Sequence, residues 1–239
     1  MRKSILLIAL LNLFYNGNAQ CWQSVSAGIY TTLGIKTDGT LWACGVNWNG
    51  QLGDGTTTDK NYFVQVGTNT NWKMVSAGES HTLAIKMDGT LWAWGSNNNG
   101  QLGLGNTTNY SSPKQVGSLT NWLQISANYT HISAVKTDGT LWSWGINIYN
   151  GNLGLGDTTN RSSPVQVGAL TTWVKIEGGN AGYHVCAIKT DGTLWSWGNN
   201  LFGKLGLGNT TYYSSPKQVG ALTNWLKVAA GYGHTLAIG

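Results

Sequence analysis

One segment occurs four times along this chain, and it restricts the possible folds more than any other feature. Each copy has an apolar run, an Asp-Gly pair and a second run that begins Thr-Leu-Trp. Asp-Gly between two alternating apolar runs predicts a β-hairpin with a tight primed turn, because glycine adopts positive φ without strain. The aspartate, glycine and first tryptophan of the four copies are Asp38, Gly39 and Trp42; Asp88, Gly89 and Trp92; Asp138, Gly139 and Trp142; Asp191, Gly192 and Trp195.

A second tryptophan follows two residues after the first in three copies, as Trp94, Trp144 and Trp197. Residues two apart on a strand share one face, so each pair forms a wide indole surface. An isolated hairpin is marginal in water, and we expect the following copy of the unit to cover this surface. Cys44 replaces the second tryptophan in the first copy and Cys186 takes the place of Leu83, so both are expected to be small core residues.

A longer period of about 50 residues contains these hairpins, marked by Trp22, Trp72, Trp122, Trp173 and Trp225. It divides the chain into units 22–71, 72–121, 122–172 and 173–224, with a partial unit at 225–239. In the second unit we expect strands A, B, C and D at 72–77, 81–86, 90–94 and about 114–116. Four short antiparallel strands at this period predict an all-β fold, a β-propeller with four complete blades and a partial fifth. A β-solenoid could share the period, but its turns are usually shorter.

The second unit reads Val-Ser-Ala-Gly, then His-Thr-Leu-Ala-Ile-Lys-Met-Asp-Gly-Thr-Leu-Trp-Ala-Trp-Gly and Gly-Gln-Leu-Gly-Leu-Gly. This pattern resembles the regulator of chromosome condensation repeat, over residues 22–239 and best within 72–121. The resemblance implies a propeller that usually closes with seven blades. Four and a half units are fewer, so either the reading frame is truncated, other chains complete the ring, or the arc stays open. We favour truncation and expect self-association through open blade edges.

The first twenty residues have the pattern of an export signal. Arg2 and Lys3 precede an apolar run at 5–14, and small residues follow at 17–19. We therefore expect a signal peptide at 1–20 and a mature chain that is secreted, periplasmic or at the cell surface, with no membrane insertion. Lipidation of Cys21 is disfavoured, because Gln20 stands where a lipobox has glycine or alanine. The family includes a nuclear exchange factor for the GTPase Ran, and export argues against guanine-nucleotide exchange of that kind.

The residues that recur in every unit do not indicate catalysis. Four histidines share one position, which predicts structural groups that hydrogen-bond the neighbouring blade: His81, His131, His184 and His234. No catalytic triad order, paired carboxylates or metal-ligand spacing is found, so we expect no enzyme activity, no metal and no cofactor. Lysines also recur once per unit and spread the positive charge, which argues against nucleic-acid binding: Lys36, Lys86, Lys136 and Lys189.

Residues that vary between units gather in the A–B and C–D connections, which emerge on the same side because strand direction alternates. They are Trp48, Glu79, Tyr110, Tyr129, Tyr149, Tyr183, Phe202, Tyr212, Tyr213 and Tyr232. Aromatic residues are enriched at interfaces, so these positions predict a binding face for a protein or a surface polysaccharide.

Three alternatives to protein binding stay open. The chain could be a lectin that stacks the aromatics on sugar rings. The aromatics could instead pack only on the long C–D connections, or the chain could be a scaffold unit of a larger surface protein. The family also includes a plant UV-B photoreceptor, which carries a tryptophan between the Ala-Gly and histidine positions. This chain has Glu79 and Ser80 there, so such sensing is disfavoured.

Overall fold

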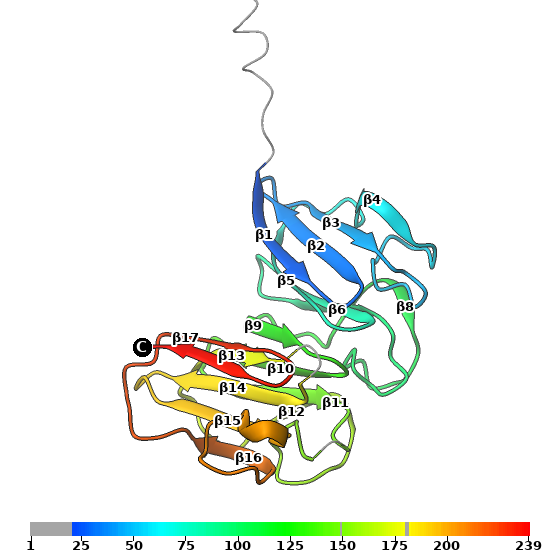
Figure 1. Ribbon diagram of the computed structural model, residues 1–239. Helices are drawn as coiled ribbons and strands as arrows, with labels where there is room; N and C mark the ends of the chain where they lie inside the picture. The colour runs from blue at the N-terminus through cyan, green and yellow to red at the C-terminus, as the bar shows by residue number, and fades with distance from the viewer. Residues whose placement is uncertain (1–20, 149, 180–181) are drawn as a thin grey trace, which may run out of the picture.

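The computed structural model describes residues 21–148, 150–179 and 182–239, which form an arc of antiparallel sheets (Figure 1). Each of four blades has its strands in the order A, B, C, D, and the partial fifth has A and B. The strands are β1 (Trp22–Ala27), β2 (Thr31–Lys36), β3 (Leu41–Gly45), β4 (Lys60–Gln65), β5 (Trp72–Ala77), β6 (His81–Lys86), β7 (Leu91–Gly95), β8 (Tyr110–Gln115), β9 (Trp122–Ala127), β10 (His131–Lys136), β11 (Leu141–Gly145), β12 (Arg161–Gln166), β13 (Trp173–Gly178), β14 (His184–Lys189), β15 (Leu194–Gly198), β16 (Tyr213–Gln218), β17 (Lys227–Ala230) and β18 (Thr235–Ile238). The expected signal peptide at 1–20 lies outside the described residues.

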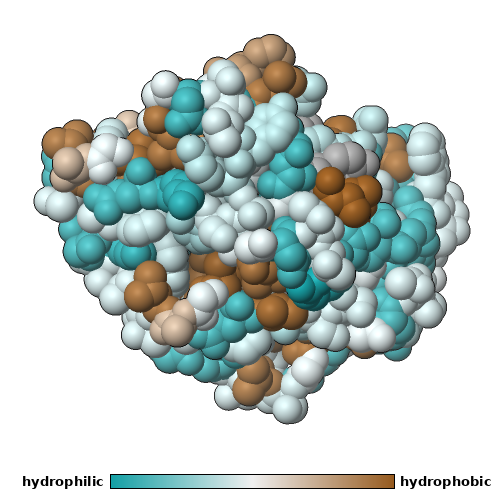
Figure 2. Space-filling view, turned by 90° about the horizontal axis from the view of Figure 1, so that it is seen from below, coloured by the Kyte–Doolittle hydropathy of each residue, from teal (hydrophilic) through white to brown (hydrophobic). Residues whose placement is uncertain are grey.

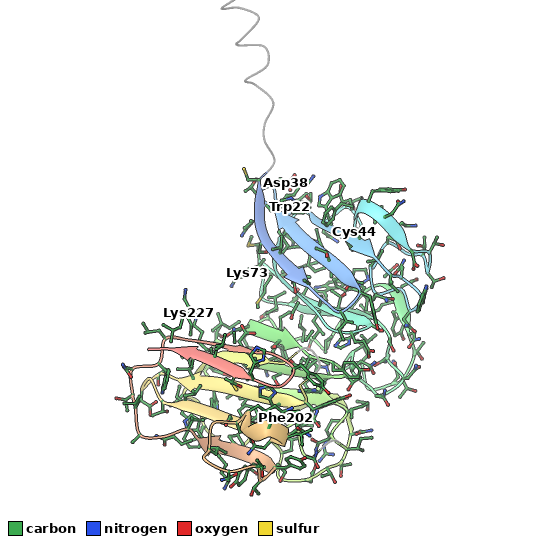
Figure 3. The ribbon with its side chains drawn as sticks, viewed as in Figure 1. Trp22, Asp38, Cys44, Lys73, Phe202 and Lys227 are labelled. Atoms are coloured by element: carbon green, nitrogen blue, oxygen red, sulfur yellow. The ribbon has the colours of Figure 1, made fainter. Side chains whose placement is uncertain are left out.

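The A strands lie next to one another and form the inner wall of the arc. β5 contacts β1 and β9, and β13 contacts β9 and β17. Lys73 of β5 and Lys227 of β17 project on this side (Figure 3). The first blade and the β17–β18 pair lie at opposite ends of the arc (Figure 1). The structure therefore confirms an all-β propeller whose described blades form an incomplete ring.

The Asp-Gly hairpins have a different turn from the one predicted. Gly89 N donates to Lys86 O and Lys86 N donates to Thr90 O, which makes a three-residue loop. Gly89 has φ of 77°, whereas Asp88 is not among the described non-glycine residues with positive φ, so the turn is not a primed one. The Asp88 carboxylate accepts bonds from Thr90 N and Oγ1 at 2.9 and 2.6 Å. These bonds lower the pKa of Asp88 and fix the corner.

Strand D is longer than predicted and begins earlier in the chain. In the second blade it is β8, Tyr110–Gln115, rather than about 114–116. It forms the outer edge of the sheet, and Pro113 is tolerated there because an edge strand does not need every N–H for pairing. Tyr110 and Tyr213 are therefore the first residues of strands β8 and β16, and not loop residues as predicted.

The indole surface of each blade is covered by the preceding blade, not by the following one as predicted. Trp94 is fully buried, and its Nε1 donates to Gln51 O of the first blade at 3.0 Å. One apolar cluster joins Leu33 and Leu41 of the first blade to Trp72 and Trp94 of the second. Trp144 and Trp197 make the same bond to Gln101 O and Asn152 O, so three blade interfaces share one construction.

Each recurring lysine lies between two indoles of its own blade. Lys86 Nζ is 3.9 Å from the ring centroid of Trp92 and 5.0 Å from that of Trp72. Burial lowers the pKa of this amine, and the electron-rich ring faces compensate part of the lost hydration. These side chains are thus part of the packing, a role that the sequence prediction did not include.

The first blade has no preceding blade among the described residues, and its equivalent face is partly open. Trp22 is 41% exposed whereas Trp72, at the same position one blade later, is fully buried. Cys44 on this face is only half-buried, whereas Cys186 is buried as expected. Trp22 and Cys44 are labelled on this blade in Figure 3. The face of the molecule that is seen from below has separate apolar patches among polar residues (Figure 2).

Candidate functional site

The A–B and C–D connections meet on one side of the molecule, which we call the loop face. Thr82, at the start of β6, donates its hydroxyl to Gln51 O in the C–D connection of the first blade. Lys204, in the C–D connection of the fourth blade, donates to Gly182 O in an A–B connection at 2.6 Å. The A–B and C–D connections therefore emerge on one side of the molecule, as the alternation of strand direction predicts.

Each C–D connection is held by a recurring buried asparagine. The Asn47 side chain accepts a bond from Leu52 N at 3.0 Å and donates to Thr56 O at 3.1 Å. Asn97, Asn147 and Asn200 make equivalent bonds in the next three blades. Because these bonds fix the loop from inside, the side chains at the loop tip need not contribute to its folding.

The loop tips expose large apolar side chains. Trp48, directly after Asn47, is 73% exposed, and Phe202 in the single-turn η1 (Leu201–Gly203) is 71% exposed. Phe202 is labelled at η1 in Figure 3. Ile148 is exposed at the corresponding tip of the third blade, and it was not among the predicted residues. The predicted Tyr149, next to it, lies outside the described residues.

Tyr129 of one A–B connection interacts with Glu79 of another and with the ring of Tyr183. Glu79 accepts a hydrogen bond from the Tyr129 hydroxyl, which is the main reason why the pKa of Tyr129 is raised to about 12. The rings of Tyr129 and Tyr183 pack edge to face with centroids 5.3 Å apart. Tyr30 is close enough to influence the same hydroxyl and is exposed. The prediction omitted Tyr30, although its place before the strand-B position is that of Tyr183.

Tyr232 of the partial fifth blade lies two residues before His234, as Tyr129 lies two residues before His131. Its side chain is 65% exposed. Lys204 donates to its carbonyl oxygen at 3.3 Å, which ties this A–B connection to the C–D connection of the fourth blade. The lysine replaces the Gln51 of the first unit, and burial lowers its pKa.

The outer aromatics do not belong to this cluster. Tyr110 and Tyr213 begin the outermost strands, and their hydroxyls accept long bonds from Asn106 and Asn209 at 3.5 and 3.4 Å. Lys114 and Lys217 lie over their rings. Tyr212 precedes β16 at the same rim and is partly exposed. Of the predicted positions that the structure describes, Tyr110 and Tyr213 thus pack at the outer rim of the blades, away from the pair formed by Tyr129 and Tyr183.

Three of the recurring histidines, His81, His131 and His184, are buried at the blade interfaces. His184 Nε2 is 2.9 Å from Thr235 Oγ1 of the next blade, which is the predicted kind of bond. At His81 and His131 it is missing: both rings are buried, and neither ring nitrogen has a partner among the described residues. The reason is the residue that takes the place of Thr235 in the next blade, which is Ile132 and Val185 respectively. His234 is exposed.

Burial penalises the charged form of these three rings. It lowers the pKa of His81 and His184 to about 4 and that of His131 to about 3. Among the described residues, no three His, Cys, Asp or Glu side chains are close enough to hold a metal ion. The same part of the chain contains no helix of the length and apolarity that a bilayer crossing requires.

The comparisons with known proteins agree with this architecture. A family model described as RCC1-like domain matches residues 9–239. The chain is 34% identical over 90 residues to the ultraviolet-B receptor UVR8 of Arabidopsis thaliana, a match that covers 37% of this chain and 20% of UVR8. It is 43% identical over 70 residues to the X-linked retinitis pigmentosa GTPase regulator of Canis lupus familiaris, covering 29% and 7%.

Among solved structures, human WBSCR16 superposes with a TM-score of 0.82 at 23% identity, covering 93% of this chain and 59% of that one. Prp20p of Saccharomyces cerevisiae superposes with a TM-score of 0.77 at 21% identity, covering 92% and 56%. The chain thus spans less than two thirds of each of these relatives, and structural similarity at this identity shows the fold alone. Taken with the blade construction and the fifty-residue period, the match along nearly all of its length shows that the chain belongs to the RCC1-like domain family.

Proposed function

We propose that this chain is an exported, non-catalytic binding scaffold that holds a protein partner on its loop face. The observation that carries the proposal is the exposure of Trp48 and Phe202 at the tips of loops whose shape is fixed by buried asparagines. Large aromatic side chains held in position on a rigid support lose little entropy on binding. A structural role for these tips is disfavoured because the loop bonds do not involve them.

Tyr129 and its partners Glu79 and Tyr183 add polar groups to the same face. Tyr129 is held by its bond to Glu79 and by the ring of Tyr183, so its hydroxyl and ring are presented in one orientation. Tyrosine combines large contact area with a hydrogen-bonding group, a combination that is enriched at protein interfaces. Protein binding is also described for a relative, since Prp20p is reported with its binding properties toward Gsp1p and histones. This binding is a property of Prp20p, and at 21% identity the similarity of the two chains extends to the fold alone.

A mutational comparison tests the loop face. The chain is probed against proteins exported by its source organism and against a glycan array, alongside a Trp48→Ala/Phe202→Ala double variant. Tyr62→Ala is the matched control, because Tyr62 is equally exposed but lies on the outer strand β4. We expect saturable protein binding that the double variant loses and the control keeps. Saturable sugar binding with the same dependence would establish the lectin instead, and equal binding by all three chains would reject the loop face.

Export is tested separately from binding. The proposal predicts that the chain is recovered outside the cytoplasm with an N-terminus near Gln20 or Cys21, because Arg2, Lys3 and the apolar run form the signal. N-terminal sequencing of the recovered protein measures this. A cytoplasmic chain that begins at Met1 would refute export and leave the binding experiment unaffected.

A further inference from the structure

Two pockets with the same lining lie at consecutive blade interfaces. The first, of about 380 Å³, is between the second and third blades, and the other, of about 270 Å³, is between the third and fourth. The first pocket is lined by the indoles of Trp122 and Trp142 and by Leu104, Leu119 and Pro164. The equivalent residues around the other pocket are Trp173, Trp195, Leu155, Leu170 and Pro216. Because the same residues build both pockets, the pocket is a property of the repeat.

The pockets lie toward the side of the molecule opposite the loop face. Trp122 is the first residue of β9 and Trp142 the second residue of β11, so both are at the strand ends away from the A–B and C–D connections. Trp122 N donates to Gly89 O of an Asp-Gly corner at 3.2 Å. We call this side the corner face. Of the predicted loop-face residues that the structure describes, none lines either pocket.

Exposed leucines form part of each pocket wall. Leu119 and Leu170 come from the connections between strands D and A, and they are 46% and 48% exposed. In the first unit, Asn69 stands at the position of Leu119, and Asp54 at that of Leu104. The first unit therefore forms its blade without these leucines. Their exposure at two interfaces is not required by the fold, and exposed apolar groups that cluster around a pocket are typical of a contact site.

A carboxylate lies beside each pocket and is connected to it through one threonine. Trp142 Nε1 donates to Thr140 Oγ1 at 2.8 Å, and Thr140 Oγ1 donates to Asp138 Oδ1 at 2.6 Å. The same chain at the other pocket, with distances of 2.9 and 2.6 Å, consists of Trp195, Thr193 and Asp191. Both aspartates are exposed. The threonine bonds lower the pKa of each carboxyl, so both are ionised at neutral pH.

A lysine also lies near each pocket, but it is not presented to a partner. Lys136 Nζ lies 3.6 Å from the ring centroid of Trp142 and 4.7 Å from that of Trp122, and the residue is 4% exposed. The lysine offsets part of the charge of Asp138, whose side chain is exposed. The charge that an incoming partner contacts is therefore the carboxylate.

An apolar pocket beside an exposed carboxylate fits a ligand in which an apolar group and a cation lie close together. We propose that the corner face binds a basic segment of another protein, which places an apolar side chain in each pocket and a lysine or arginine beside Asp138 and Asp191. A second copy of this chain fits less well, because a symmetric contact would bring the aspartates of one copy against those of the other. This surface is additional to the loop face.

A peptide experiment tests the proposal. The probe is a fluorescein-labelled peptide with the sequence Ser-Lys-Ser-Leu-Ser-Lys-Ser-Leu-Ser, in which leucine and lysine share one side of an extended backbone. Binding to the full chain is measured by fluorescence anisotropy at about 150 mM salt, so that distant charges are screened. We expect saturable binding. It should be at least about tenfold weaker when glutamate replaces both lysines, and likewise when serine replaces both leucines.

Two double variants change the two parts of the site separately. Leu119→Asn/Leu170→Asn introduces the residue that the first unit has at this position, Asn69, so the fold should be kept and binding should weaken at least about tenfold. Asp138→Asn/Asp191→Asn keeps the oxygen that accepts the threonine bonds and removes the charge. This variant should bind the peptide at least about threefold more weakly.

The controls separate this surface from general adhesion and from the loop face. Leu123→Asn is the matched control, because Leu123 is 40% exposed but lies on β9 of the inner wall. It should bind the peptide as the parent does, and so should Trp48→Ala/Phe202→Ala, so the two proposals fail independently. Loss of binding in either control, unchanged affinity in either double variant, or equal binding of the glutamate peptide would overturn the proposal. Sedimentation of the parent as a dimer that Leu119→Asn/Leu170→Asn dissociates would identify a second copy as the occupant and would also overturn it.

Discussion

Replacing Trp144 by alanine should uncouple the third blade from the second. The indole is fully buried, and it lies in one apolar cluster with Leu83 and Leu91 of the second blade. Its Nε1 donates to Gln101 O at 3.0 Å, and its ring centroid is 6.0 Å from that of Trp122. Truncating a buried tryptophan typically costs about 3–5 kcal/mol in transfer and cavity terms. We expect a loss of about 4 kcal/mol here, because the surrounding strands are paired on both sides and cannot collapse into the space.

The distribution of this loss along the arc can also be measured. In repeat proteins each unit contacts only its neighbours, so weakening one interface lets the two flanking parts unfold separately. Urea unfolding followed by circular dichroism should show a lower midpoint and a smaller apparent m-value, or two transitions. Trp144→Phe should cost less, about 1–2 kcal/mol, since it keeps an apolar ring and loses the donor to Gln101 O.

The control for this experiment is an equal truncation away from any interface. Trp48→Ala should stay within about 0.5 kcal/mol of the parent, because the Trp48 side chain is exposed at a loop tip. If Trp144→Ala shifts the free energy of unfolding by less than about 1 kcal/mol with an unchanged m-value, the indole does not hold the blades together and the account of the interfaces is wrong.

Two further predictions concern the turns and the histidines. Gly139→Ala should lower the free energy of unfolding in urea more than Gly117→Ala does. Both glycines have positive φ, but only a Cβ at Gly139 would collide with the Thr171 carbonyl oxygen. Equal losses in the two variants would contradict the structure. The free energy of unfolding should fall as the pH drops from about 6.5 toward 4. In the unfolded chain histidine takes up a proton near pH 6.5, whereas the buried rings of His81 and His131 stay neutral until about pH 4 and 3. The loss amounts to up to about 2 kcal/mol per histidine at pH 5. His131→Leu should reduce this slope in unfolding measured between pH 7.5 and 5, and an unchanged slope would show that the ring is not held neutral by burial.

The sequence predicted strands A and B of the second blade residue by residue, because their apolar alternation begins and ends at clear signals. Strand D was placed too late for a physical reason. β8 reads Tyr-Ser-Ser-Pro-Lys-Gln, and an outer edge strand with one partner needs no apolar alternation. The turn type was also not readable, since a primed two-residue turn and a three-residue loop both require glycine at the same place.

The direction in which the indoles pack could not be derived from the period, because a repeat pattern is the same for either neighbour. The lysines did carry a signal that the sequence prediction missed, since a purely solvated charge has no reason to recur beside tryptophan in every unit. Lys136 in fact lies 3.6 Å from the Trp142 centroid.

The side on which the A–B and C–D connections emerge could be predicted from the sequence, but not which of their side chains contact one another, and the loop construction explains both results. The side of the molecule follows from strand alternation alone, whereas the residues that reach one another depend on loop packing that varies between blades. The buried asparagine holds each C–D connection whether the following residue is Trp48, Asn98, Ile148 or Leu201. A tip residue can therefore change without altering the blade, so its replacement should change the proposed binding rather than the stability of the chain. The interfaces between blades would stay as they are, because the loop bonds do not involve the tip side chains.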